Sequence, residues 1–350
     1  MTYKHMKRQN RENKNGCLWA FLVVIFSLLS FGIVATVFNF SGLFTTLISV
    51  LLSILLINKM LGKPSAKSAI GKGISIFIIL FFFQWFGRFL INNLELYSKE
   101  EARFKKEEAV KESTTIETED TLKVFTSNRK WKDNYGKKYS GDLTVRKSDY
   151  DRLKNHINGY PVPSGGNFWG NLYNYIERTD TPSLDLVIEN FSEINKNQNL
   201  NQMEFADMVV SCIQDIPYSF VFQNKCLPAD SYEDSIKQVL VDCPDCCIGN
   251  IKYGIQNPVS FVQSLKGDCD TRTVIIYSIL KHFNYDVAIV NSNFYRHSIL
   301  GINIPSRGLY KLHNGKRYVL WETTGKYFEI GQLSKAFNDV THWNIVLTSK

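Results

Sequence analysis

Three long apolar runs occupy the first hundred residues and limit what this part of the chain can fold into. They are CLWAFLVVIFSLLSFGIVATVF (17–38), GLFTTLISVLLSILLI (42–57, extendable to Leu61) and ISIFIILFFFQWFGRFLINNLEL (74–96). A helix needs about 20 apolar residues to cross the hydrocarbon of a bilayer, and each run supplies close to that number. Segment 17–97 is therefore predicted to form three transmembrane helices, with the lipid bilayer as a partner.

Basic residues indicate the orientation of these helices. The N-terminal segment 1–16 and the loop after the second run carry Lys4, Lys7, Arg8, Arg11, Lys14, Lys59, Lys63, Lys67 and Lys72. The short NFSG loop between the first two runs carries none, so the positive-inside rule places both basic segments in the cytoplasm. A cleaved signal peptide is the alternative for the first run, but a second apolar run follows at once. We therefore expect a multi-pass protein of the cell (inner) membrane, with residues beyond 97 outside the cytoplasm or in the periplasm.

The net charge of +8 does not indicate nucleic-acid binding. Most of the excess lies in the two segments that membrane topology already explains. Beyond residue 120 the basic residues alternate with acidic ones and form no stripe interleaved with aromatics, which is typical of a solvated surface. We therefore expect no nucleic-acid partner.

The rest of the chain divides by composition. Segment 98–120 is charged at nearly every position and is predicted to be a helical or disordered stalk. Segment 121–199 is an α/β lead-in, in which RKWKDNYGKKYSGDLTV predicts a hairpin and PVPSGGNFWG (161–170) a loop. Segment 200–350 opens with an amphipathic helix over 201–216.

A cysteine-rich insertion, 226–247, contains Cys226, Cys243, Cys246 and Cys247. Zinc is an alternative, but a tetrahedral site needs two well-spaced ligand pairs, which this insertion lacks, so no metal is expected. An oxidising compartment favours disulfides, with three possible connectivities and no bridge between the adjacent Cys246 and Cys247. Cys212 falls on the apolar face of helix 201–216 and is expected in the core. Cys269 would then be the free thiol.

Cys269 stands in KGDCDTR, at the head of an apolar run. Gly267 permits a tight turn or a close approach, and Asp268 is a good N-cap for a helix ending near Asn284. Cys269 then falls in the first helical turn, where the helix dipole favours its thiolate. Asp268 and Asp270 oppose that effect, so a nucleophilic Cys269 needs an imidazolium nearby.

His297 is the histidine best placed to provide it. It opens the strand-like run HSILGINI, after the short strand DVAIV. Asn314-Gly315 then predicts a hairpin turn, with KRYVLWETTG as its return arm. Alternation in this arm puts Tyr318, Leu320 and Glu322 on one face, so Glu322 can orient an imidazole on a neighbouring strand.

The segments KGDCDTR, HSILGI and YVLWETTG together resemble the transglutaminase-like superfamily, and IPYSF (216–220) is similar to its segment before the catalytic cysteine. The resemblance covers roughly residues 200–332. It implies an α+β papain-like fold, with the cysteine at a helix N-terminus packed on an antiparallel sheet. It also implies Cys269 as nucleophile, His297 as general base and acid, and Glu322 as orienting acid, where many members have aspartate. The oxyanion donors would be the Cys269 backbone N–H and Gln263 or Gln256.

The expected activity is therefore acyl transfer by a membrane-anchored cysteine enzyme that needs no cofactor. A protease or amidase is favoured over a protein cross-linker, because no acidic run or second basic site suggests capture of an amine. Its substrate would be a peptide or protein outside the cytoplasmic membrane. Two alternatives remain: an inactive binding module of the same fold, and a structural protein whose cysteines are all bridged.

Overall fold

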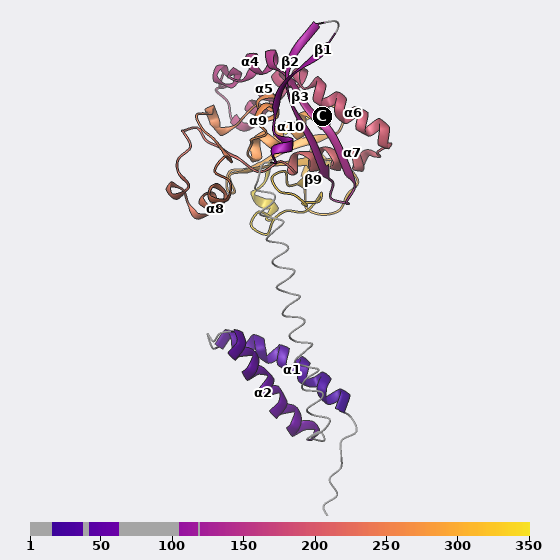
Figure 1. The fold of residues 1–350 in the computed structure, drawn as a ribbon, viewed down its shortest axis with the longest axis vertical. Helices are drawn as coiled ribbons and strands as arrows, with labels where there is room; N and C mark the ends of the chain where they lie inside the picture. Colours follow the sequence, from indigo (N-terminus) through magenta and orange to yellow (C-terminus); the bar gives the residue numbers. More distant parts are fainter. Residues whose placement is uncertain (1–15, 38–41, 63–104, 118–119) are drawn as a thin grey trace, which may run out of the picture. The chain divides into compact units, whose positions relative to one another are not determined.

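The computed structural model describes residues 16–37, 42–62, 105–117 and 120–350 (Figure 1). The chain divides into two compact units, Met1–Leu96 and Tyr97–Lys350. This boundary falls at the end of the third apolar run of the sequence. Each unit is described by itself.

The first unit contains helices α1 (Gly16–Val37) and α2 (Gly42–Leu61), which coincide with the first two apolar runs. The Trp19 indole N–H donates to Asn58 Oδ1 at 3.0 Å, and Ser30 hydrogen-bonds Ser53, so the two helices pack together. In the described part of the chain, no helix qualifies by length and apolarity as a membrane span. The third predicted span, 74–96, lies outside the described residues, so the membrane topology stays a prediction.

The second unit begins with an antiparallel sheet in the order β1-β2-β3, formed by Lys111–Glu117, Asp120–Lys132 and Lys138–Arg146. Strands β2 and β3 form the predicted hairpin, and Asp133 Oδ1 accepts the N–H groups of Tyr135 and Lys137 in its turn. The prediction of a helical or disordered stalk over 98–120 is wrong for residues 111–117, which form β1. Pairing with β2 supplies the backbone hydrogen bonds that this polar segment could not obtain alone.

Several helices follow this sheet. They are α4 (Lys147–Leu153), α5 (Phe168–Asp180), α6 (Asp185–Gln198), α7 (Gln202–Gln214), α8 (Asp234–Asp242) and α9 (Pro258–Ser264). Helix α7 matches the helix predicted over 201–216. It begins with a capping box, in which Asn201 accepts the Glu204 N–H and Glu204 accepts the Asn201 N–H.

A second antiparallel sheet has the order β10-β6-β7-β9-β8. Its strands are β6 (Val287–Ser292), β7 (His297–Ile302), β8 (Tyr310–His313), β9 (Lys316–Trp321) and β10 (Asn344–Thr348). Helix α10 (Cys269–His282) packs against β6 and β7. The turn between β8 and β9 uses Asn314 and Gly315, both with positive φ, as a two-residue hairpin requires. The predicted α+β class is therefore confirmed.

Both faces of this second sheet are buried. Leu300, Val319 and Trp321 face the main core, which also contains Trp131 of β2. Ile299, Leu320 and Trp343 form a separate cluster on the other face. Since the main core draws on residues before and after position 200, segments 121–199 and 200–350 share one core.

The cysteine-rich insertion contains α8 and the short strand β5 (Cys247–Ile248), which pairs in parallel with β4 (Phe220–Val221). The structure pairs Cys226 with Cys247 and Cys243 with Cys246. Figure 1 shows α8 on the opposite side of this unit from α6 and α7. In the described part of this second unit, Cys212 and Cys269 are the free thiols.

One buried cation joins the start of α10 to the end of α7. The Arg272 guanidinium donates to the carbonyl oxygens of Gly267, Ile213, Ile216 and Pro217 at 2.7–3.0 Å. Arg272 is fully buried, and this burial lowers its pKa to about 10. Its planar fork of donors suits several carbonyls at once, which an ammonium group cannot match.

Replacing Arg272 with Met should lower the free energy of unfolding by about 3–5 kcal/mol, because four buried carbonyls lose a charged donor. Arg272→Lys should lose less, since it keeps the charge. Pulse proteolysis in urea would measure both, with the exposed Arg178→Met on α5 as control. Equal stability of Arg272→Met and the control would show that this cation is dispensable.

Candidate active site

Cys269 is the first residue of α10. Its neighbour Asp268 is the N-cap and accepts the Thr271 N–H at 3.1 Å and the Thr271 hydroxyl at 2.8 Å. At Gly267, a Cβ atom would lie 2.7 Å from both Phe261 and Thr271 side-chain atoms. The predicted N-cap and the predicted close approach at Gly267 are therefore confirmed.

Cys269 is buried, with 6% of the residue exposed. Burial, followed by the charges of Asp270 and Asp268, raises the pKa of Cys269 well above its ordinary value. The backbone N–H of Ser298 acts in the opposite direction and favours the thiolate. Cys269 therefore rests as a neutral thiol and needs a base to become a nucleophile.

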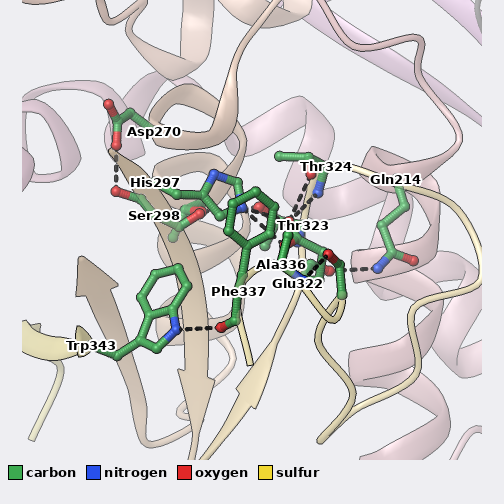
Figure 2. A network of polar contacts seen from close by, with 12 residues as sticks. Gln214, Asp270, His297, Ser298, Glu322, Thr323, Thr324, Ala336, Phe337 and Trp343 are labelled. Atoms are coloured by element: carbon green, nitrogen blue, oxygen red, sulfur yellow. Dashed lines mark hydrogen bonds and ion pairs between the residues drawn. The ribbon is translucent and has the colours of Figure 1, made fainter. Parts of the chain in front are cut away.

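His297 and Glu322 form the predicted pair. His297 Nε2 lies 2.9 Å from Glu322 Oε2 and 3.1 Å from Oε1, and Figure 2 shows the imidazole facing this carboxylate. The exposed fraction is 11% for the His297 side chain and 2% for that of Glu322. With Nε2 engaged by Glu322, Nδ1 is the nitrogen left to exchange a proton with another group.

Other contacts hold Glu322 in place. Its Oε1 accepts the N–H groups of Thr323 and Thr324 and the Thr324 hydroxyl at 2.7–3.0 Å. Gln214 of α7 donates to its backbone carbonyl at 2.7 Å. Burial opposes ionisation, but the His297 contact and the Thr324 hydrogen bonds outweigh it and lower the pKa of Glu322. Glu322 is therefore an anion that can stabilise a charged imidazole.

Strand alternation puts the His297–Glu322 pair and the residues that follow each of them on opposite faces of the sheet. His297 and Glu322 belong to the face of Ile299 and Leu320, whereas Ser298 and Thr323 point toward α10. The Ser298 N–H favours the Cys269 thiolate and the charge of Glu322 opposes it, so the thiol lies near the start of β7. In the described part of the chain, the Cys269 sulfur has no hydrogen bond to His297. Such bonds are often long before a substrate binds.

Aromatic residues from the C-terminal segment pack on the imidazole. The Phe337 ring stacks on His297 with centroids 5.1 Å apart, and Trp343 lies edge-on at 5.8 Å. The Trp343 indole N–H donates to the Phe337 carbonyl at 2.8 Å, as Figure 2 shows. These contacts shield the His297–Glu322 pair from water.

The two candidate oxyanion donors differ in their surroundings. The Gln256 side-chain amide donates to the Lys266 carbonyl at 2.8 Å, so this N–H is already engaged. Gln263 is partly exposed on α9. The Gln256 amide therefore supports the loop before Cys269, and the Gln263 side chain is the more exposed of the two.

Sequence reasoning missed several residues that support the site. They are Arg272, Thr273, Ser298, Thr323, Gln214, Phe337 and Trp343. Arg272 stands inside the KGDCDTR motif, and an arginine one turn into an apolar helix was a signal that could have been followed. The other contacts join segments far apart in the chain, so no local pattern indicates them.

Tyr218 of the IPYSF segment also lies near the thiol. The Arg272 guanidinium is 5.6 Å from its ring centroid, and the Ser219 N–H donates to Gly267 O at 3.3 Å. Burial, and then the charges of Cys269 and Asp268, raise the pKa of Tyr218. Its hydroxyl therefore stays neutral.

Within the described residues, no three His, Cys, Asp or Glu side chains gather as a metal ion would require. Comparison with known proteins finds no match among family models, curated proteins or solved structures. The transglutaminase-like resemblance therefore rests on the quoted motifs alone.

Asp268 should make the stability of the protein depend on pH. Burial and the charge of Asp270 raise its pKa from an ordinary 3.8 to about 8. The stabilisation that protonated Asp268 provides is thus complete below about pH 4 and is lost as the pH rises to about 8. Between pH 5 and pH 8, wild type should lose about 1–3 kcal/mol relative to Asp268→Asn, which keeps an acceptor for Thr271.

Urea unfolding followed by pulse proteolysis at both pH values would measure this difference. The exposed Asp245→Asn should follow wild type. Parallel stability curves for wild type and Asp268→Asn would contradict the prediction.

Proposed function

We propose that this protein is a cysteine acyl-transfer enzyme of transglutaminase-like type, in which Cys269 is the nucleophile, His297 the base and Glu322 the orienting acid. The observation that carries the proposal is the His297–Glu322 pair at 2.9 Å beside a free thiol at the N-terminus of α10. Three residue types suited to nucleophilic catalysis thus stand at the start of a helix, at the start of a strand and directly after another strand.

In the proposed reaction, His297 takes the Cys269 proton as the sulfur attacks a peptide or carboxamide carbonyl. A carbon–sulfur bond forms, and the resulting oxyanion is stabilised by the Cys269 backbone N–H. The carbon–nitrogen bond then breaks, and the amine or ammonia leaves with the proton from the His297 imidazolium. Glu322 stabilises that cation between the two transfers.

Water then attacks the thioester and gives a proton to His297. The carbon–sulfur bond breaks, the acid leaves, and His297 returns the proton to the Cys269 sulfur. Hydrolysis, as by a protease or amidase, is favoured over cross-linking because the sequence suggests no dedicated site for an amine acceptor. The proposed substrate is a peptide or protein outside the cytoplasmic membrane.

A second candidate function is a binding module that uses the same fold without chemistry. Two observations favour it: the neutral, largely buried Cys269 thiol and the Phe337 ring stacked on His297. This module would bind envelope peptides or proteins. The two functions differ in whether His297 controls the reactivity of Cys269.

Iodoacetamide labelling of Cys269, located by peptide mass, tests this difference. If His297 is its base, His297→Ala should slow labelling at pH 7 by at least about tenfold, since the thiolate loses its counter-ion. Above about pH 10, solvent should remove the thiol proton in both proteins and the rates should converge.

Two variants sharpen the comparison. Glu322→Gln keeps a hydrogen-bond acceptor but removes the charge, and its rate at pH 7 should fall between those of wild type and His297→Ala. His313→Ala, at the end of β8, should label like wild type. Equal rates for wild type and His297→Ala at pH 7 would support the binding module instead.

We also propose that the chain is a multi-pass membrane protein with its second unit outside the cytoplasm. The three apolar runs and the basic segments around them support this. Trypsin added to right-side-out vesicles should digest the second unit. In inverted vesicles the second unit should be protected from trypsin. Release of the whole chain by alkaline carbonate would contradict membrane insertion.

A further inference from the structure

Each of the three proposed catalytic residues is followed in the chain by a polar residue that points toward α10 or lies on it. These neighbours are Asp270, Ser298 and Thr323. Together with Thr273, one turn beyond Cys269, they form a hydrogen-bonded set that we call the tethering network.

The contacts of the network join three elements. The Ser298 hydroxyl donates to Asp270 Oδ1, which links β7 to the first turn of α10 and is drawn in Figure 2. Thr273 donates to the Ser298 backbone carbonyl at 3.2 Å and shares a hydrogen bond of 3.0 Å with the Thr323 hydroxyl. Ser298, Thr273 and Thr323 are fully buried.

Two further residues fix the network from outside. The Tyr173 hydroxyl of α5 donates to Asp270 Oδ1 at 2.7 Å and lies 3.0 Å from the Ser298 hydroxyl. Asn291 of β6 donates to the Ser298 hydroxyl at 2.9 Å and to the Tyr173 hydroxyl at 3.2 Å. Ser298 is thus held from α5, β6 and α10 at once.

The network matters because Cys269 and the His297–Glu322 pair have no direct hydrogen bond between them in the described structure. Their relative position must come from the backbone, and the network fixes that backbone one residue beyond each of them. Side chains of adjacent strand residues point to opposite faces, so His297 and Glu322 can face the site while Ser298 and Thr323 hold the helix.

We propose that Asp270, Thr273, Ser298 and Thr323 are positioning residues that hold the Cys269 thiol where His297 can act on it. This inference rests on the proposed function. Catalytic groups must be held within a fraction of an ångström, and hydrogen-bonded supporting residues provide that precision.

Asp270 has a second effect that the test must separate from positioning. Its carboxylate acts on the thiol together with Asp268 of the same helix start and Glu322 after β9. Tyr218 before β4 also faces the thiol, Arg272 brings positive charge to this region, and His297 faces Asp270. Removing the Asp270 charge should therefore ease ionisation of Cys269. Asp270→Asn removes the charge but keeps an acceptor for Tyr173 and Ser298, whereas Asp270→Ala removes both.

The experiment measures how strongly His297 controls Cys269 in each background. In the full chain, iodoacetamide rates at pH 7 are compared with and without His297→Ala, as a double-mutant cycle. The wild-type ratio should be at least about tenfold. It should fall below about threefold in Asp270→Ala and be largely retained in Asp270→Asn.

A second pair keeps the test valid if Asp270→Ala does not fold. Thr323→Val removes the hydroxyl with little change in shape and should also reduce the ratio, whereas Thr323→Ser should restore it. Ser278→Ala is the matched control, because this buried α10 hydroxyl bonds, among the residues that the structure describes, only to the Val274 carbonyl of its own helix. It should keep the full wild-type ratio.

The outcomes separate the two hypotheses. If wild type itself shows no dependence on His297, the proposed function fails and the positioning role falls with it. If wild type shows the dependence and Asp270→Ala and Thr323→Val keep it in full, the proposed function stands and the tethering network is overturned.

Discussion

The hydrogen bonds from Arg272 to four backbone carbonyls are the interaction on which the rest of the site depends. They fasten the loop before Cys269 to the end of α7 and to the segment that continues into Tyr218. A buried guanidinium is costly unless its donors are satisfied, so few arrangements of these segments are compatible with it. The position of the thiol follows from this constraint.

The electrostatics of the site are divided between its two halves. Around Cys269, burial and two neighbouring carboxyl groups favour the neutral thiol. Around the His297–Glu322 pair, the imidazole and Thr324 lower the pKa of Glu322 and keep this carboxyl group anionic. A proton passing from sulfur to imidazole would thus leave a disfavoured thiolate and place its charge beside the Glu322 anion, which suits a base that acts as the sulfur attacks.

Local sequence patterns predicted several helices and turns of the second unit. Asp268 as an N-cap, the apolar run after it and Asn314-Gly315 between two strands predicted α10 and the β8–β9 hairpin correctly. The alternation of Tyr318, Leu320 and Glu322 also matched the observed faces. The stalk prediction was wrong for residues 111–117. Their polar composition cannot form a core by itself, but pairing with β2 orders them as a strand.

The sequence by itself determined features that depend on neighbouring residues: helix starts, turns, strand faces and the order of Cys269, His297 and Glu322. Only the tertiary structure decided which of three disulfide connectivities forms and which carbonyls Arg272 binds. It also decided that Ser298 and Thr323 face α10 while Phe337 covers His297. Apart from the Cys243–Cys246 bridge and the Arg272–Gly267 hydrogen bond, these contacts join segments that lie far apart in the chain. Their geometry is set by the packing of the whole core rather than by any local pattern.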